Sequence, residues 1–80
     1  MIIREDLKDF VVEALRAHNK RASIVEICKY VWDNHEAELR SSGDLFYTWQ
    51  YEIRWAGYEL RKTGTLLSAG RQQKGMWELV

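Results

Sequence analysis

The side chains best suited to catalysis or metal binding are gathered in residues 33–38, which read DNHEAE. His35 and Glu36 begin like the helix of a zinc protease, but leucine stands at position 39, where that motif requires a second histidine. Together with Asp33 and Glu38 they are close enough in sequence to surround a metal ion. A solvated helix end explains the same charges more simply, so we predict no metal site here.

Catalytic motifs are absent from the rest of the sequence as well. It contains no glycine-rich phosphate loop, no cysteine–histidine pair at metal-ligand spacing and no G-x-S-x-G turn. Cys28 is the only cysteine, which excludes an intramolecular disulfide, and its apolar helical neighbours predict a small buried side chain. His18 is interpreted as a cation at a helix end. We therefore expect a protein that is not an enzyme and has no catalytic residue, metal or cofactor.

Residues 45–62 carry chemistry of a different kind, suited to contact. Apolar residues recur there at every third or fourth position, which predicts a long helix from about Leu45 to Lys62. Its core residues are Phe46, Trp49, Ile53, Ala56 and Leu60. At 100° per residue, the opposite face holds Tyr47, Tyr51, Trp55, Tyr58 and Lys62. This aromatic face either contacts a partner or packs within the domain. We favour packing for Trp55, under the second helix and the sheet, and leave both interpretations open for the tyrosines.

Two further helices precede this one. The first covers about residues 4–18, where apolar side chains recur with helical spacing along one face. The second begins at Ser23, because Glu26 follows three positions later and the two residues have the spacing of a capping box. It is expected to end near Glu38. Residues 20–22, between the two helices, leave room for no more than a turn or a brief strand.

The hydrophobic pattern changes after Gly64. Two short strand-like runs, Leu66–Ser68 and Met76–Leu79, flank the sequence GRQQKG, which predicts a β-hairpin with a long tip. The element order is then three helices followed by two strands. We therefore predict one α+β domain over residues 1–80, mainly helical, with the winged helix-turn-helix fold, in which a two-stranded hairpin forms the wing.

The C-terminal half of the chain contains an arginine–tryptophan–alanine run, a later leucine, a basic–glycine turn and a closing strand. The residues concerned are Arg54, Trp55, Ala56, Leu60, Gly64, Leu66, Gly75, Met76, Trp77 and Leu79. Over about residues 46–79 the chain resembles the N-terminal domain of Mrr-type restriction endonucleases; in the first two helices only the apolar pattern agrees. The resemblance implies a DNA-binding winged helix of the kind usually fused to a nuclease domain. These 80 residues leave no room for a nuclease fold, so the resemblance implies no catalytic role.

In a helix-turn-helix module, the first turns of the third helix face the major groove of double-stranded DNA. Here those turns present Tyr47, Thr48, Gln50, Tyr51 and Arg54. Glutamine pairs with adenine, arginine pairs with guanine, and an aromatic edge packs on a thymine methyl group. We therefore expect these five residues to contact DNA. The nearby acidic residues Asp44 and Glu52 would oppose the approach of phosphates.

The hairpin tip supplies a second set of candidate DNA contacts. These are Arg71, Gln72, Gln73 and Lys74, which a wing uses on the phosphate backbone or in the minor groove. The alternative is a winged helix that binds no DNA and uses the aromatic face of its third helix for a homodimer or a partner protein. The basic hairpin favours DNA, whereas the neutral net charge favours the alternative.

The charge is balanced overall but unevenly distributed. Residues 1–44 hold 7 basic and 9 acidic residues, a balance of −2, and residues 45–80 hold 5 basic and 3 acidic, a balance of +2. The positive half is the one with the candidate contacts. No run of about 18 apolar residues is present, and the first residues lack the pattern of a signal peptide. We therefore expect no membrane partner and a cytoplasmic location.

Overall fold

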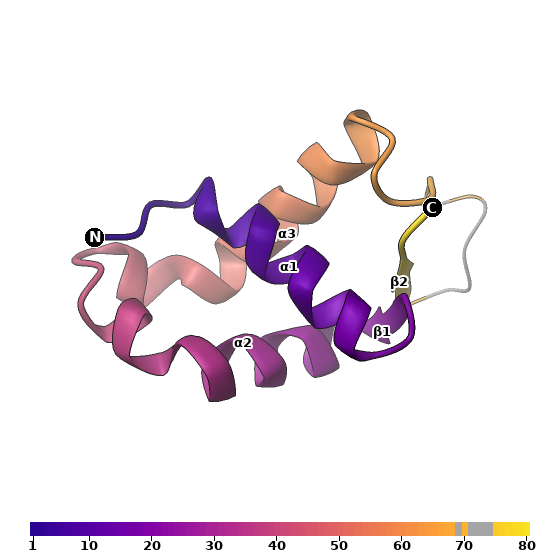
Figure 1. Cartoon of the computed structure of the whole chain (residues 1–80). Helices are drawn as coiled ribbons and strands as arrows, with labels where there is room; N and C mark the ends of the chain where they lie inside the picture. The colour runs from indigo at the N-terminus through magenta and orange to yellow at the C-terminus, as the bar shows by residue number, and fades with distance from the viewer. Residues whose placement is uncertain (69, 71–74) are drawn as a thin grey trace.

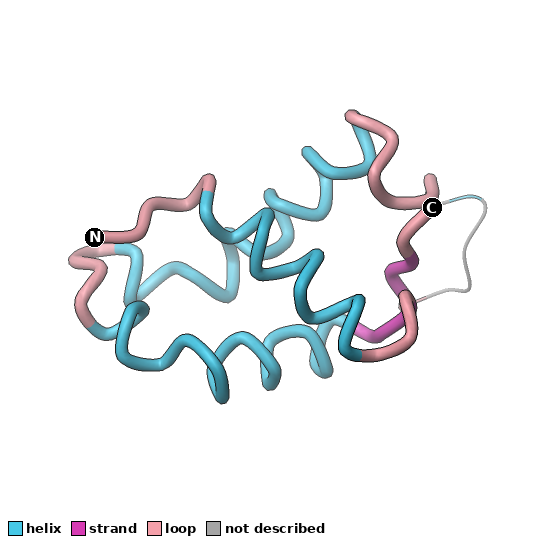
Figure 2. Tube along the Cα trace, viewed as in Figure 1, coloured by secondary structure: helices cyan, strands magenta, loops and turns pink. Residues whose placement is uncertain are grey.

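Three helices form most of the fold of the computed structural model, which describes residues 1–68, 70 and 75–80. They are α1 (Asp6–Ala17), α2 (Ile24–Arg40) and α3 (Leu45–Lys62). Helix α1 packs against both α2 and α3 (Figure 1). The bounds of α3 are those that its apolar spacing predicts, and α2 continues two residues beyond the expected Glu38. The loops that join the helices are short (Figure 2).

The start of α2 has the predicted capping box. The Ser23 hydroxyl accepts a hydrogen bond of 3.2 Å from the backbone N–H of Glu26, and the Glu26 carboxylate accepts one of 2.8 Å from the backbone N–H of Ser23. Each bond satisfies a donor that a helix N-terminus leaves unpaired. This arrangement fixes where α2 begins and separates it from the strand before it.

The strands lie together at the end of the molecule that holds the C-terminus (Figure 1). Strand β1 (Arg21–Ser23) pairs antiparallel with β2 (Met76–Glu78), with Ala22 opposite Trp77. A brief strand at this position was one of the two predicted alternatives and is confirmed. The predicted pairing of residues 66–68 with 76–79 is present as a single bridge between Leu66 and Leu79.

Hydrogen bonds at the C-terminus show that it lies between two neighbours. The Leu79 N–H donates to the Lys20 carbonyl, whereas the Val80 N–H donates to the Thr65 carbonyl. Successive N–H groups of an extended chain point in opposite directions, so residues 20–23 and 65–67 flank the same segment. The domain is therefore a mainly helical α+β fold with a small antiparallel sheet.

All three helices and the sheet contribute to the core. Its fully buried side chains include Leu7, Val11, Ala14 and Leu15 of α1, Ile27, Val31 and Leu39 of α2, and Ile53 and Ala56 of α3. Four of the five core residues predicted for α3 are buried. The exception is Phe46, whose ring lies 6.4 Å from that of Trp32 and 5.1 Å from that of Tyr47.

Gly57 allows the sheet to pack against α3. A Cβ atom at this position would lie 2.5 Å from the indole of Trp77, closer than real Cβ contacts. The guanidinium of Arg61, one turn later, lies 5.1 Å from the centre of the same ring. Trp77 is 8% exposed as a result. The helical pattern of α3 does not reveal this requirement, because the contact joins residues 20 positions apart.

His35 joins α2 to α1 rather than ending a solvated helix. Its backbone departs from helical geometry (φ −132°, ψ 22°), and its ring stacks on Phe10 at 3.8 Å between centres. Its Nε2 lies 3.0 Å from Glu13 of α1 and its Nδ1 lies 2.6 Å from Glu38. The interpretation of these charges as a solvated end is thus wrong for His35, whose side chain is 14% exposed.

The ion pairs of His35 predict a stability that depends on pH. Burial lowers the pKa of His35, but hydrogen bonds with Glu38 and Glu13 and their negative charges outweigh it and raise the pKa above its ordinary value. The pKa of Glu13 is raised by burial and lowered by its bond with His35, and the lowering prevails. A raised histidine pKa stabilises the fold fully below the unfolded value of about 6.5, and this contribution is lost as pH rises through the folded value.

We therefore expect the variant His35→Gln to have a lower free energy of unfolding than the wild type. The difference should be largest near pH 5–6, which lies between the ordinary pKa values of a carboxyl group and a histidine, and should become smaller at higher pH. Urea unfolding at a series of pH values measures this difference. The variant Glu13→Gln serves as a partial control, since it leaves Glu38 in place and should remove only part of the effect. A difference that is constant with pH would assign His35 a packing role alone.

Candidate functional site

Three tyrosines of α3 lie on the side of the helix that faces away from the core. Tyr47, Tyr51 and Tyr58 are 81%, 72% and 59% exposed, respectively. We call these three residues the tyrosine face. The sequence left open whether they pack within the domain, and the structure leaves them exposed. Large rings are thus available for contact along most of α3.

Trp55 does not belong to the tyrosine face. It packs against the core, as predicted, but its cover differs from the one predicted. The guanidinium of Arg4 lies 4.0 Å from its ring centre and the ammonium of Lys8 lies 5.6 Å away. The residues that cover Trp55 therefore come from the N-terminal segment and α1, because α1 rather than α2 runs along this side of α3.

Arg54 is the cation of α3 that remains available to a ligand. The ammonium of Lys62 lies 3.3 Å from Glu59, and Arg61 stacks on Trp77. Arg54 is exposed and has no acidic partner among the described residues. Glu52, whose charge would oppose phosphates, forms a 3.3 Å ion pair with Arg4. The net effect is a positive charge beside the tyrosine face and a neutralised carboxylate on its flank.

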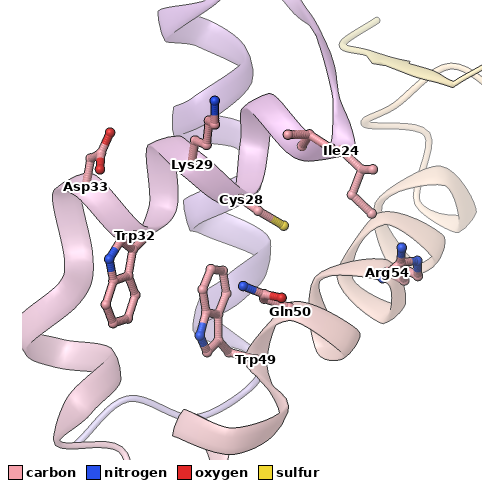
Figure 3. Close-up of a pocket in the computed structure, with 9 residues that line it drawn as sticks. Ile24, Cys28, Lys29, Trp32, Asp33, Trp49, Gln50 and Arg54 are labelled. Carbon is pink, nitrogen blue, oxygen red and sulfur yellow. The ribbon is translucent and has the colours of Figure 1, made fainter.

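Two hollows that share lining residues lie beside this charge, and Figure 3 shows the side chains that line the first of them. The first, which we call the α2–α3 groove, has a volume of about 400 Å³ and is lined by Ile24, Val25, Cys28, Lys29, Trp32, Asp33, Trp49, Gln50 and Arg54. The second, of about 600 Å³, is lined by Trp32, Phe46, Tyr47, Thr48, Trp49, Gln50, Tyr51 and Arg54. Trp32, Trp49, Gln50 and Arg54 line both. The groove and the early turns of α3 therefore form one continuous surface.

All five site residues predicted on α3 line the second hollow, so the structure brings Tyr47, Thr48, Gln50, Tyr51 and Arg54 together. The four residues predicted at the hairpin tip, Arg71, Gln72, Gln73 and Lys74, lie outside the described residues. Sequence reasoning missed the contribution of α2. The only hint was that aromatic and polar residues flank its buried stripe.

Cys28 is partly buried and lines the groove, whereas the sequence predicted a buried core side chain. Burial raises the pKa of its thiol, and the positive charge of Arg54 offsets part of this rise. Figure 3 shows Cys28 on α2 facing the helix that carries Gln50 and Arg54.

In the described part of the chain, no three or more His, Cys, Asp or Glu side chains form a group that could hold a metal ion. None of the described helices is both long and apolar enough to cross a membrane.

Comparisons of the chain with protein-family profiles, curated proteins and solved structures found no match. The structure by itself defines a small, mainly helical α+β domain with an antiparallel sheet at one end. Its candidate site combines an exposed tyrosine face, one available arginine and an aromatic groove between α2 and α3.

Proposed function

We propose that the domain is a winged helix-turn-helix that binds double-stranded DNA with α3 as its recognition helix. The element order supports this assignment: β1 lies between α1 and α2, and β2 follows α3 and pairs with β1. A turn of four residues, 41–44, joins α2 to α3, as in a helix-turn-helix. In chain order, residues 67–75 fall between the Leu66 bridge and β2, which is where a winged helix has its wing.

The observation that carries the proposal is the placement of five readout side chains in one hollow on the early turns of α3. Gln50 and Arg54 supply the groups that pair with adenine and guanine. Tyr47 and Tyr51 supply edges for thymine methyl groups and hydroxyls for phosphates. The ion pair between Arg4 and Glu52 reduces the repulsion that the sequence suggested.

The resemblance to the N-terminal domain of Mrr-type restriction endonucleases supports the fold in particular. Leu60, Leu66 and Trp77 are buried, and Gly64 and Gly75 have φ values of 81° and 79°, a conformation that favours glycine. These residues determine packing and turns rather than contact with a ligand. We infer a module that acts as a small regulator or as the targeting part of a larger assembly in the cytoplasm, and not as an enzyme.

A second function is favoured by the size of the tyrosine face. Three large rings exposed along one helix are typical of a protein interface, since tyrosine is enriched in such contacts. The chain also has no net charge, which weakens its attraction for DNA. The second candidate is therefore a homodimer or partner-protein contact through Tyr47, Tyr51 and Tyr58.

Binding of a short labelled duplex, followed by fluorescence anisotropy, tests the first function. We expect a dissociation constant at or above about 10⁻⁴ M for an arbitrary sequence at physiological salt. A domain of this size contacts about three to five phosphates, so log K should fall with log salt with a slope of about −2.7 to −4.5. Arg54→Ala should weaken binding, whereas Arg16→Ala, an exposed arginine of α1, should not.

The oligomeric state of the same protein, measured by sedimentation equilibrium, decides between the two functions. A monomer that binds the duplex, with the expected salt dependence, supports DNA binding. A stable dimer that binds no duplex even at low salt, and that dissociates when Tyr47, Tyr51 and Tyr58 are changed to alanine, would replace the first function by the second.

A further inference from the structure

The α2–α3 groove has aromatic walls that are held in place by the protein itself. The rings of Trp32 and Trp49 are inclined by only 7°, with centres 6.1 Å apart. Trp49 is 5% exposed, and the guanidinium of Arg40 lies 5.0 Å from the ring centre of Trp32. Trp49 is almost fully buried and forms the floor of the groove, so the partly exposed ring of Trp32 is the one on which a flat ligand can stack, and it loses little freedom in doing so. The groove is thus suited to a planar ring.

Polar groups surround the same opening. Gln50 provides an amide, and Asp33 a carboxylate, so donors and acceptors are both available. Lys29 and Arg54 provide positive charge from opposite helices. The side chains of Gln50 and Arg54 make no hydrogen bond to any other described residue. A matching ligand would have a flat aromatic face, an edge with donors and acceptors, and an attached anion.

A nucleotide with an unpaired base has all three properties, and the position of the groove agrees with this ligand. Gln50 and Arg54 line both the groove and the hollow in which we place the DNA contacts. A base that leaves a duplex lying on α3 therefore has a short path to Trp32 and Cys28. The attached phosphate would remain near Arg54.

We propose that the α2–α3 groove binds an unpaired DNA base, so that the domain prefers a duplex with a bulged nucleotide over a fully paired one. This proposal depends on the proposed DNA-binding function. A paired base must first be unstacked and unpaired, and this penalty is smallest for a base that is already unpaired. Stacking on an aromatic side chain then adds affinity in a manner that depends little on base identity.

Three matched duplexes test the proposal by fluorescence anisotropy: one fully paired, one with a single bulged nucleotide, and one with an abasic residue in the bulge. The abasic duplex keeps the flexible backbone and the phosphate but has no base to stack. We expect the bulged duplex to bind about tenfold more tightly than the paired one, as stacking of one base would produce. The abasic duplex should lose this advantage.

Cys28 offers an independent readout, because it is the only cysteine and lines the groove. The bulged duplex should slow the reaction of Cys28 with a thiol reagent, and the abasic duplex at equal occupancy should slow it much less. The groove-filling variant Cys28→Phe should bring the ratio of its affinities for the bulged and paired duplexes close to one. If this variant does not fold, protection of Cys28 in the wild type remains the deciding measurement.

The outcomes separate this inference from the proposed function. Equal affinity for the bulged and abasic duplexes, or a Cys28 reaction rate that neither changes, overturns base binding in the groove and leaves duplex binding intact. Failure to bind any of the three duplexes at low salt overturns both.

Discussion

Replacing Gly57 by alanine is expected to destabilise the domain by about 1–3 kcal/mol, the usual penalty for overpacking a core. Alanine is the better helix former by about 1 kcal/mol, so helix propensity alone predicts the opposite sign. The steric effect prevails, because the new Cβ atom would lie 2.5 Å from the rigid indole of Trp77. The indole must then move away from its position against Gly57 of α3. Urea unfolding followed by circular dichroism measures the change.

A double-mutant cycle with Trp77→Leu provides the control for this prediction. Leucine is smaller than tryptophan, so the space beside position 57 opens. Gly57→Ala should then stabilise the domain by up to about 1 kcal/mol, which reverses the sign seen in the wild-type background. Contact between two residues is what produces such coupling. If Gly57→Ala instead stabilises the domain in the wild-type background, the close packing of Trp77 against Gly57 is contradicted.

The helices were predictable because their signals are local and repeated. The apolar spacing of α3 sets its bounds, and the pair Ser23 and Glu26 sets the start of α2. The pairing of β1 with β2 was not predictable, since a strand of three residues has too few positions to display a period of two. Its partner is also more than 50 residues away in the chain. The requirement for Gly57 was hidden for the same reason.

The candidate site likewise contains residues that local sequence predicts and residues that depend on how the helices pack. The five α3 residues could be predicted because they lie in the first turns of a helix whose bounds the local apolar spacing gives, the turns that a helix-turn-helix module presents to DNA. The contribution of α2 depends on how two helices cross, which local spacing does not specify. Cys28 and Trp32 therefore enter the site only in the structure. A net charge also does not show which charged residues form pairs. In the structure Glu52 is paired with Arg4, whereas Arg54 has no acidic partner among the described residues.

Arg54→Ala is expected to reduce affinity for a preferred DNA site by about 1–3 kcal/mol and to relax the preference at one base pair. The preferred site would be selected from randomised duplexes with the wild-type domain. The selection is then repeated with the variant. The proposed function gives the reason for a localised loss. The guanidinium of Arg54 is exposed and has no acidic partner among the described residues, and the proposal assigns it a base edge as its partner. Gln50→Ala should produce the same kind of loss at a neighbouring base pair.

A comparison with the residues predicted for the hairpin tip makes the expectation for Arg54 specific. Arg71→Ala combined with Lys74→Ala should weaken all sequences equally and reduce the salt slope by about 2, because a phosphate contact carries no sequence information and each contributes about one unit. A uniform loss from Arg54→Ala, with unchanged preference at every base pair, would reassign Arg54 to the phosphate backbone. Sequence preference would then have to come from Gln50 and the tyrosine face.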